Sequence, residues 1–353
     1  MSEKKRILTG DRTTGKLHLG HYVGSLQNRV RLQDEYESFI LLADIQALTT
    51  HFEHPELLEH SIYEVAMDNL SVGLNPNKIT LVQQSRIPSI GELTVFYSML
   101  VSVNSLRHNP TIKTEAANYG YNDMTYGFLG YPVSQSADIT FCKANLVPVG
   151  EDQKPHMEMT RKIVRRFNEL YGEDQLPMIE QTREIVHKFN AVYGETLVEP
   201  DMMLSDCPRL MGLDGNAKMG KSLGNAIYLS DPAEEVRKKV MSAVTDASRI
   251  KKDDPGHPDV CVVSKYHKVF NAGEYENICE SCKKGAIGCV ACKKALAASL
   301  NDLLEPFREK RAYYEAHRDE VRDIILTGSE KANKIGNETV KEVKEAMHIY
   351  IGD

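Results

Sequence analysis

Residues 9–21 read Thr-Gly-Asp-Arg-Thr-Thr-Gly-Lys-Leu-His-Leu-Gly-His, and this stretch decides the fold. Apolar Ile7 and Leu8 precede it and the periodic run 22–26 follows it, so a short strand leads through a glycine turn into a helix. At such a junction, backbone N–H groups and the positive end of the helix dipole face one point, where a phosphate group binds. His18 and His21 lie at the helix entrance, close enough in the sequence to face one ligand together.

The rest of the first half predicts a parallel sheet. Residues 38–43 and 78–83 are apolar runs typical of buried strands, and residues 56–72 between them carry apolar side chains at helical spacing. The order strand, helix, strand predicts parallel pairing. Because ligands bind at the carboxyl ends of such strands, the polar segment after residue 43, which contains Gln46, is assigned to the site.

The length of 353 residues favours two domains. Residues 1–230 are interpreted as an α/β, Rossmann-type domain with helices on both faces of the sheet and a helical insertion at 88–145. Residues 231–353 lack any convincing strand pattern and are predicted to form an all-helical domain that ends in an amphipathic run at 330–349.

The first domain also contains a 22-residue tandem repeat at about 150–193. Gly-Glu-Asp-Gln at 150–153 returns at 172–175, and Phe-Asn at 167–168 returns at 189–190. A single duplication has too few copies for a solenoid. Copy one follows the predicted strand 146–149 directly, so we expect copy one to supply the working residues.

Composition and charge narrow the function. No apolar stretch approaches the roughly 20 residues that span a bilayer, and the N-terminus has no signal-peptide core, so we expect a cytoplasmic protein without membrane contact. A net charge of −7 argues against holding nucleic acid by bulk electrostatics. Any RNA contact must be local; Lys283, Lys284, Lys293 and Lys294 are candidates, although such a group is usually a solvated face.

A second basic loop, Lys-Met-Gly-Lys-Ser at 218–222, follows the first by some two hundred residues. Two such loops can grip one nucleoside triphosphate from both sides. Together they resemble the HIGH and KMSKS signatures of class I aminoacyl-tRNA synthetases, which implies activation of a carboxylate by ATP. That reaction is an in-line displacement at the α-phosphate, in which the protein mainly positions groups and stabilises charge.

The resemblance implies the roles of the nucleotide-site residues. His18, His21, Lys218 and Lys221 are the expected catalytic residues, with Mg²⁺ accompanying the phosphates. The expected ATP contacts are Gly10, Arg12, Thr14, Gly15, His18, Gly20, His21, Lys113, Gly150, Asp152, Lys218, Met219, Lys221 and Ser222. Two positions depart from the family pattern: Thr13 stands where proline is common, and Gly220 replaces the first serine of KMSKS. We expect Gly220 to slow loop closure while the chemistry is retained.

The spacing of Tyr131, Gln135 and Asp138 places them on one helix face. A buried Asp138 could accept a hydrogen bond from an indole N–H or a phenol O–H, whereas the alternative is a surface charge. Three stretches, 9–26, 147–153 and 328–347, resemble tryptophanyl-tRNA synthetases of bacteria. The resemblance implies a homodimer that joins tryptophan to tRNA(Trp), with Thr9, Gly10, Gln46, Tyr131, Gln135, Asp138 and Gln153 in the tryptophan pocket. A tyrosyl enzyme, and a synthetase-like protein that binds tryptophan or RNA without charging tRNA, remain alternatives.

Five of the seven cysteines crowd the helical part. The spacing Cys279-x2-Cys282-x6-Cys289-x2-Cys292 alone would indicate structural zinc. Some bacterial tryptophanyl-tRNA synthetases carry a [4Fe–4S] cluster in this region, and the pattern of Cys261, Cys282, Cys289 and Cys292 resembles theirs. The resemblance thus implies an iron–sulfur cluster with Cys279 to spare, and zinc is the alternative.

Overall fold

The computed structural model describes residues 4–149, 186, 189–191, 196–198, 201–204, 210–215, 219–251 and 253–352. Most of the tandem repeat lies outside the described residues, and so do four expected site residues, Gly150, Asp152, Gln153 and Lys218. For Ser222 the backbone is described but the side chain is not.

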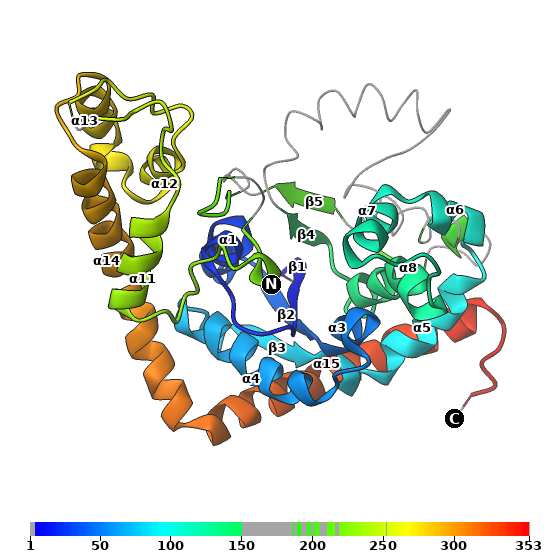
Figure 1. Ribbon diagram of the computed structural model, residues 1–353. Helices are drawn as coiled ribbons and strands as arrows, with labels where there is room; N and C mark the ends of the chain where they lie inside the picture. Colours follow the sequence, from blue (N-terminus) through cyan, green and yellow to red (C-terminus); the bar gives the residue numbers. More distant parts are fainter. Residues whose placement is uncertain are drawn as a thin grey trace.

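A parallel sheet forms the centre of the described chain, with the strand order β3-β2-β1-β4-β5 (Figure 1). Its strands are β1 (Arg6–Arg12), β2 (Glu37–Ala43), β3 (Ile79–Gln83), β4 (Leu146–Val149) and β5 (Asp201–Leu204). All four strand pairs are parallel. The predicted strands 38–43 and 78–83 and the parallel sheet are therefore confirmed.

Helices cover both faces of this sheet. The first part of the chain contains α1 (Leu19–His21), the π-helix η1 (Tyr22–Leu26), α2 (Gln27–Leu32), α3 (Asp44–His51), α4 (Glu56–Ser71), the 3-10 helix η2 (Gln84–Arg86), α5 (Pro88–Ser98), α6 (Val103–His108), α7 (Pro110–Tyr119) and α8 (Tyr126–Thr140). These bounds confirm the helix expected at 56–72 and the helical insertion at 88–145.

Two hydrophobic cores form because successive side chains of a strand point to opposite faces. Ile40 and Leu42 of β2 join one core with α1, α4 and α14, whereas Phe39 and Leu41 join the other with α5 and α8. The sheet is thus buried on both sides, as parallel sheets usually are.

The last third is helical, as predicted. After the short 3-10 helix η4 (Lys221–Leu223) come α11 (Ala233–Ser242), α12 (Val262–Phe270), α13 (Ala272–Lys283), α14 (Cys289–Ala316) and α15 (Arg318–Ala346). In Figure 1, α11 to α14 form an arm beside the sheet, and α15 runs back along the sheet to α5.

Helix α15 packs on the edge strand β3. A Cβ atom on Gly328 would lie 2.1 Å from the Leu81 carbonyl oxygen, so the backbones of helix and strand are in close contact. The Gln83 N–H donates to Ser329 Oγ at 3.1 Å. Small residues on α15 allow this approach, and the helix covers an edge that would otherwise be exposed.

No helix in the described ranges is both long and apolar enough to cross a membrane.

Candidate active site

The turn after β1 brings two histidines together. His18 caps the N-terminus of α1, and its Nδ1 accepts a hydrogen bond from the Gly20 N–H at 3.1 Å. His21 Nδ1 accepts from the His18 N–H at 3.2 Å, and the two ring centroids are 3.9 Å apart. Because each Nδ1 is an acceptor, the neutral rings carry their protons on Nε2. Both histidines can therefore act as hydrogen-bond donors through Nε2.

Three glycines in this turn and at the end of β1 are needed for steric reasons. Gly15 has φ +102°, a conformation that disfavours other residues. A Cβ atom on Gly20 would lie 2.9 Å from Cε1 of His18, and one on Gly10 would lie 2.5 Å from the Leu41 carbonyl oxygen. The backbone of the turn can therefore pack closely against β2 and the His18 ring.

The second basic loop folds back onto this turn. Lys221 Nζ donates to the Gly15 carbonyl at 2.7 Å and lies 3.5 Å from Thr14 Oγ1. Just beyond it, the Leu19 N–H donates to the Ile227 carbonyl at 3.0 Å, and His18 forms an antiparallel bridge with Tyr228. The two loops, far apart in the sequence, thus meet as the two-sided grip requires.

The other members of this loop are placed close by. Met219 is buried, with its Cβ 3.7 Å from where a Cβ on Gly20 would lie. The Gly220 N–H donates to Asn225 Oδ1 at 3.0 Å, and Gly220 has an ordinary extended conformation (φ −149°) that any residue can adopt. Ser222 lies in η4. The serine-to-glycine departure is thus not required by the backbone of this loop.

Burial lowers the pKa of Lys221 to about 8, although the carboxylates of Asp11 and Asp68 oppose the shift. The ammonium group therefore loses its proton near the upper end of the physiological pH range. A lysine in this state is sensitive to any negative charge that binds beside it.

A buried polar network supports the turn from below, and the sequence did not reveal it. Arg29 Nη1 donates to Asp11 Oδ2 at 2.6 Å and to Asn69 Oδ1 at 2.8 Å. Burial opposes ionisation of Asp11, but the Arg29 guanidinium holds the pKa of Asp11 below its ordinary value. Asp68 Oδ2 accepts from the Leu17 N–H at 2.6 Å. The sequence does contain a signal for this network. Polar residues occupy positions on the buried face of α4 where the helical spacing predicts apolar side chains such as leucine or valine.

A second polar group lies at the carboxyl ends of β2 and β3. Asp138 of α8 is buried, and its Oδ1 accepts from Gln84 Nε2 at 2.8 Å. Gln84 Oε1 in turn accepts from the Gln46 N–H at 3.0 Å. Burial raises the pKa of Asp138 to about 7, the Gln84 hydrogen bond opposes the shift, and the charge of Asp44 adds to it. Asp138 is therefore not a surface charge, and Gln84 is a site residue that the sequence reasoning missed although it directly follows a predicted strand.

The remaining expected pocket residues lie on neighbouring elements. Tyr131 of α8 is buried, and both burial and the nearby Glu115 carboxylate raise its pKa. Glu115 Oε1 accepts from Arg12 Nη2 at 3.1 Å, which links α7 to the end of β1. Thr9 is buried and Gln135 is half-buried, whereas Lys113, an expected ATP contact, is exposed on α7.

Five cysteines gather where α12, α13 and α14 meet. Cys261 caps α12, Cys282 lies near the end of α13, and α14 begins at Cys289. Burial raises the pKa of Cys292 to about 12, and the neighbouring cysteines add to the shift. Arg249 Nη1 lies 3.7 Å from Cys282 Sγ. In the part of the chain that the structure describes, no three side chains of His, Cys, Asp or Glu converge as ligands of one metal ion.

Comparisons with known proteins identify the family of this chain. The family model described as tRNA synthetases class I (W and Y) matches residues 1–171 and 169–305. The two matched segments meet at the junction of the two repeat copies. The chain is 49% identical to the tryptophan–tRNA ligase of Streptococcus mutans over 356 residues, which covers 98% of each chain. The corresponding identity with the ligase of Streptococcus pneumoniae is 46%, again with 98% of each chain covered.

A similar solved structure is tryptophanyl-tRNA synthetase from Campylobacter jejuni complexed with ADP and tryptophan. It has a TM-score of 0.81 and 26% identity, and the match covers 97% of this chain and 99% of that one.

Proposed function

The chain belongs to the class I tRNA synthetases for tryptophan and tyrosine, and we propose that it is a tryptophan–tRNA ligase. It activates tryptophan with ATP, which gives tryptophanyl-adenylate and pyrophosphate. It then transfers the tryptophanyl group to the terminal ribose of tRNA(Trp). The observation that supports this reaction is the contact of Lys221 with the turn at Thr14 and Gly15, which brings the two basic loops together as binding one nucleotide from both sides would require. The near full-length identity with a tryptophan–tRNA ligase carries the choice of substrate.

Adenylate formation needs only charge stabilisation and alignment at the turn. A carboxylate oxygen of tryptophan attacks the α-phosphorus, and the bond to the bridging oxygen of pyrophosphate breaks. The Nε2–H groups of His18 and His21 donate to phosphate oxygens, and Lys221 follows the negative charge onto departing pyrophosphate. Lys218 is assigned the same role by its position in the loop.

The other nucleotide contacts frame this reaction. Backbone groups of Gly10, Thr14, Gly15, Gly20 and Ser222 line the phosphates, Arg12 and Lys113 add positive charge, and Met219 borders the adenine. Gly150 and Asp152 of repeat copy one lie outside the described residues and are assigned to the ATP site by the resemblance, Asp152 as a contact of the ribose. Mg²⁺ enters with the phosphates; such an ion commonly keeps several waters and needs no cage of protein ligands.

The tryptophan pocket is built around the Gln84–Asp138 pair. Gln84 occupies Asp138 Oδ1, so Oδ2 can accept the indole N–H. Thr9, Gln46, Tyr131, Gln135 and, from repeat copy one, Gln153 complete the pocket. A pocket that hydrogen-bonds its substrate rejects analogues lacking the donor by a factor on the order of 10⁴–10⁵.

The helical arm is the proposed tRNA anticodon-binding part. It comprises α11 to α14, whereas α15 packs with the sheet of the catalytic part. Lysines near the tip of the arm, including Lys283 and Lys284, provide local positive charge despite the acidic chain. Charging of tRNA also places the protein in the cytoplasm.

The cysteines of the arm fit a [4Fe–4S] cluster held by Cys261, Cys282, Cys289 and Cys292. In such a cluster each cysteine binds a different iron atom, so the four cysteine sulfurs lie around the outside of the cluster. Zinc would require the four sulfurs to converge on one ion. The cysteines that raise the pKa of Cys292 include Cys261, Cys282 and Cys289, and also Cys279. The Arg249 guanidinium beside Cys282 matches the hydrogen bonds that cluster thiolates accept. Cys279 is left over, 3.7 Å from Ser264 Oγ.

When bound, the cluster would tie together the ends of α12, α13 and α14. Protein purified without oxygen should contain about four irons per chain, and Cys289→Ser should lower that content and the thermal stability of the arm while adenylate formation survives. Stoichiometric zinc without iron would overturn this assignment.

The reaction is tested by amino-acid-dependent exchange of pyrophosphate into ATP. Exchange with tryptophan is expected to be much more efficient than with tyrosine, because the phenol O–H does not lie where the indole N–H does. Preference for tyrosine would identify a tyrosyl enzyme. Tryptophan binding without exchange would identify a non-catalytic relative.

A further inference from the structure

Arg311, near the end of α14, is buried against α4 between two carboxylates. Its Nη2 donates to Glu64 Oε2 at 2.6 Å, and its Nη1 donates to Asp68 Oδ1. The Arg311 side chain is 4% exposed, and those of Glu64 and Asp68 are 6% and 1% exposed. A buried charge is tolerated only when it is matched, so this contact fixes how α14 lies on α4.

Asp68 passes the contact on to the nucleotide turn. While Oδ1 holds Arg311, Oδ2 accepts from the Leu17 N–H at 2.6 Å. Leu17 is fully buried and directly precedes His18. A shift of the Asp68 carboxylate would therefore move the backbone from which both histidines are presented.

The same face of α14 reaches the other end of this turn. Phe307, four residues before Arg311, lies with its ring centroid 5.3 Å from that of Tyr22, the residue after His21. Residues four apart share a helix face. One face of α14 therefore supports the segment from Leu17 to Tyr22 at both ends.

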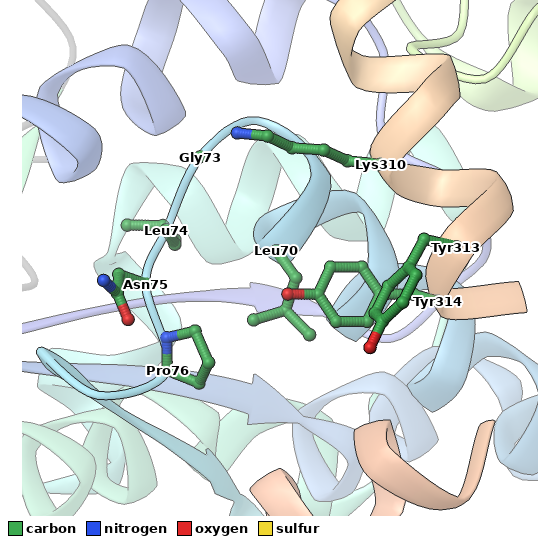
Figure 2. Close-up of a pocket in the computed structure, with 8 residues that line it drawn as sticks. All are labelled: Leu70, Gly73, Leu74, Asn75, Pro76, Lys310, Tyr313 and Tyr314. Atoms are coloured by element: carbon green, nitrogen blue, oxygen red, sulfur yellow. The ribbon is translucent and has the colours of Figure 1, made fainter. Parts of the chain in front are cut away.

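A pocket lies at the same helix junction as Arg311, between α14 and the turn after α4 (Figure 2). Its volume is about 350 Å³. It is lined by Leu70, Gly73, Leu74, Asn75, Pro76, Lys310, Tyr313 and Tyr314. Apolar contact alone thus leaves this end of the helix junction partly open.

We propose that Arg311 is a positioning residue for ATP: acting through Asp68, it holds the Leu17 backbone so that His18 and His21 meet the phosphates. The inference rests on the proposed function for the identity of the ligand. Arg311 touches neither the turn nor the Asp138 pocket, so its effect should fall on ATP and not on tryptophan.

The test compares Arg311→Lys and Arg311→Met with wild type in tryptophan-dependent pyrophosphate exchange. Misplacing reacting groups by about 1 Å can cost about 100-fold in rate, so Arg311→Met should lower kcat/KM for ATP by tens to about 100-fold. Lysine keeps the charge but cannot bridge both carboxylates, so Arg311→Lys should show a smaller loss of about 3- to 10-fold. The KM for tryptophan should change by less than about 2-fold, because its pocket is separate.

Arg308 provides the matched control. It lies one turn earlier on α14 and donates five hydrogen bonds, whereas Arg311 donates three. The Arg308 bonds go to Glu305, Asn301 and the Asp231 carbonyl, none of which is on α4. Arg308→Met should leave the ATP kinetics within about 2-fold of wild type, as expected for a site without shared partners.

Asp68→Asn and the double variant with Arg311→Lys complete the design and cover the case that Arg311→Met does not fold. Because both changes break the same link, their effects on KM for ATP should be less than additive. Wild-type ATP kinetics in Arg311→Lys, or equal increases in KM for ATP and tryptophan, would refute the positioning role. If wild type shows no exchange, that result rejects the proposed function and not the role of Arg311. In that case the role of Arg311 is tested by comparing the ATP affinity of wild type and variants by calorimetry without amino acid.

Discussion

Asp138 and Gln84 show how a carboxylate can be buried at a site without a full charge partner. The Gln84 amide supplies one hydrogen bond, and the pKa of Asp138 is raised from its ordinary value to about 7 by burial. The folded protein therefore holds a proton that the unfolded chain has lost between about pH 4 and pH 7. Stability should fall as the pH rises through this window.

Asp138→Asn should therefore stabilise the protein at pH 8 while it impairs tryptophan activation. Asparagine keeps an oxygen for Gln84 and removes the buried charge, which at about 1.4 kcal/mol per pKa unit amounts to an increase of about 1–4 kcal/mol in unfolding free energy. Thermal or urea unfolding measures the gain. At pH 4 the variant and wild type should differ much less, and a gain of equal size at both pH values would contradict the assigned cause.

Lys221 gives a second prediction that depends on pH. Its charged form stabilises the leaving pyrophosphate, and its pKa in the free protein is about 8. We expect kcat/KM for ATP to fall as the pH rises through about 8, because this parameter reports on the free enzyme. Lys221→Arg should move that decline above the measurable range, and Lys221→Ala should raise the barrier by roughly 2–4 kcal/mol below about pH 8 and by less above it. A decline at the same pH in the arginine variant would assign it to another group.

Single site residues near the glycine turns and on one helix face could be predicted from the sequence, but their long-range partners could not. The spacing of Tyr131, Gln135 and Asp138 predicted a shared helix face, and Asp138 is indeed buried. Arg311 and Glu64, by contrast, are separated by 247 positions, and no local pattern links them. Only the tertiary packing of α14 on α4 brings such a pair together.

At the scale of elements, the sequence pattern predicted the long segments and the short strand β4, and missed other short elements. β2, β3 and α4 lie where apolar runs or helical spacing placed them. β5 has only four residues and begins with Asp201, so it offers too little pattern to stand out from a loop. The π-helical turn at Tyr22–Leu26 was also missed, because its extra residue per turn has no sequence signature; such turns are frequent at functional sites.

The tandem repeat gives the prediction at this scale. Copy one follows β4 (Leu146–Val149) directly, so Gln153 should reach the tryptophan pocket and its counterpart Gln175 should not. Gln153→Ala should raise KM for tryptophan or abolish exchange, whereas Gln175→Ala should behave like wild type. Steady-state exchange on the two variants decides between the copies. The opposite pattern would mean that copy two has displaced copy one from the site.

For the whole molecule, α15 makes the catalytic part discontinuous in sequence. The chain leaves the sheet, builds the arm of α11 to α14 and returns along β3. Composition and periodicity indicated that the last third of the chain is helical, but not which helices pack together. An amphipathic pattern shows which face of a helix is buried, but not which other element packs against that face.

Exposed apolar side chains on and beside α5 and α6 are candidates for the interface of the homodimer that the family resemblance implies. Val95 and Met99 are four residues apart and 56% and 69% exposed, and Val103 at the start of α6 is 53% exposed. Exposed apolar groups of this kind mark interaction surfaces. Met99→Glu should shift sedimentation toward the monomer, whereas Met347→Glu, beyond α15, should not. A wild-type protein that sediments as a monomer at micromolar concentration would exclude this interface.

The most direct test of the account is the charging of a tRNA(Trp) transcript with radiolabelled tryptophan, at saturating ATP and Mg²⁺. Wild type should form acid-precipitable tryptophanyl-tRNA with a stoichiometry near one per transcript, should leave tRNA(Tyr) uncharged with either amino acid, and should lose the activity in Lys221→Ala. Charging of tRNA(Tyr) with tyrosine, or pyrophosphate exchange with tryptophan but no charging of tRNA(Trp), would contradict the assignment as a tryptophan–tRNA ligase.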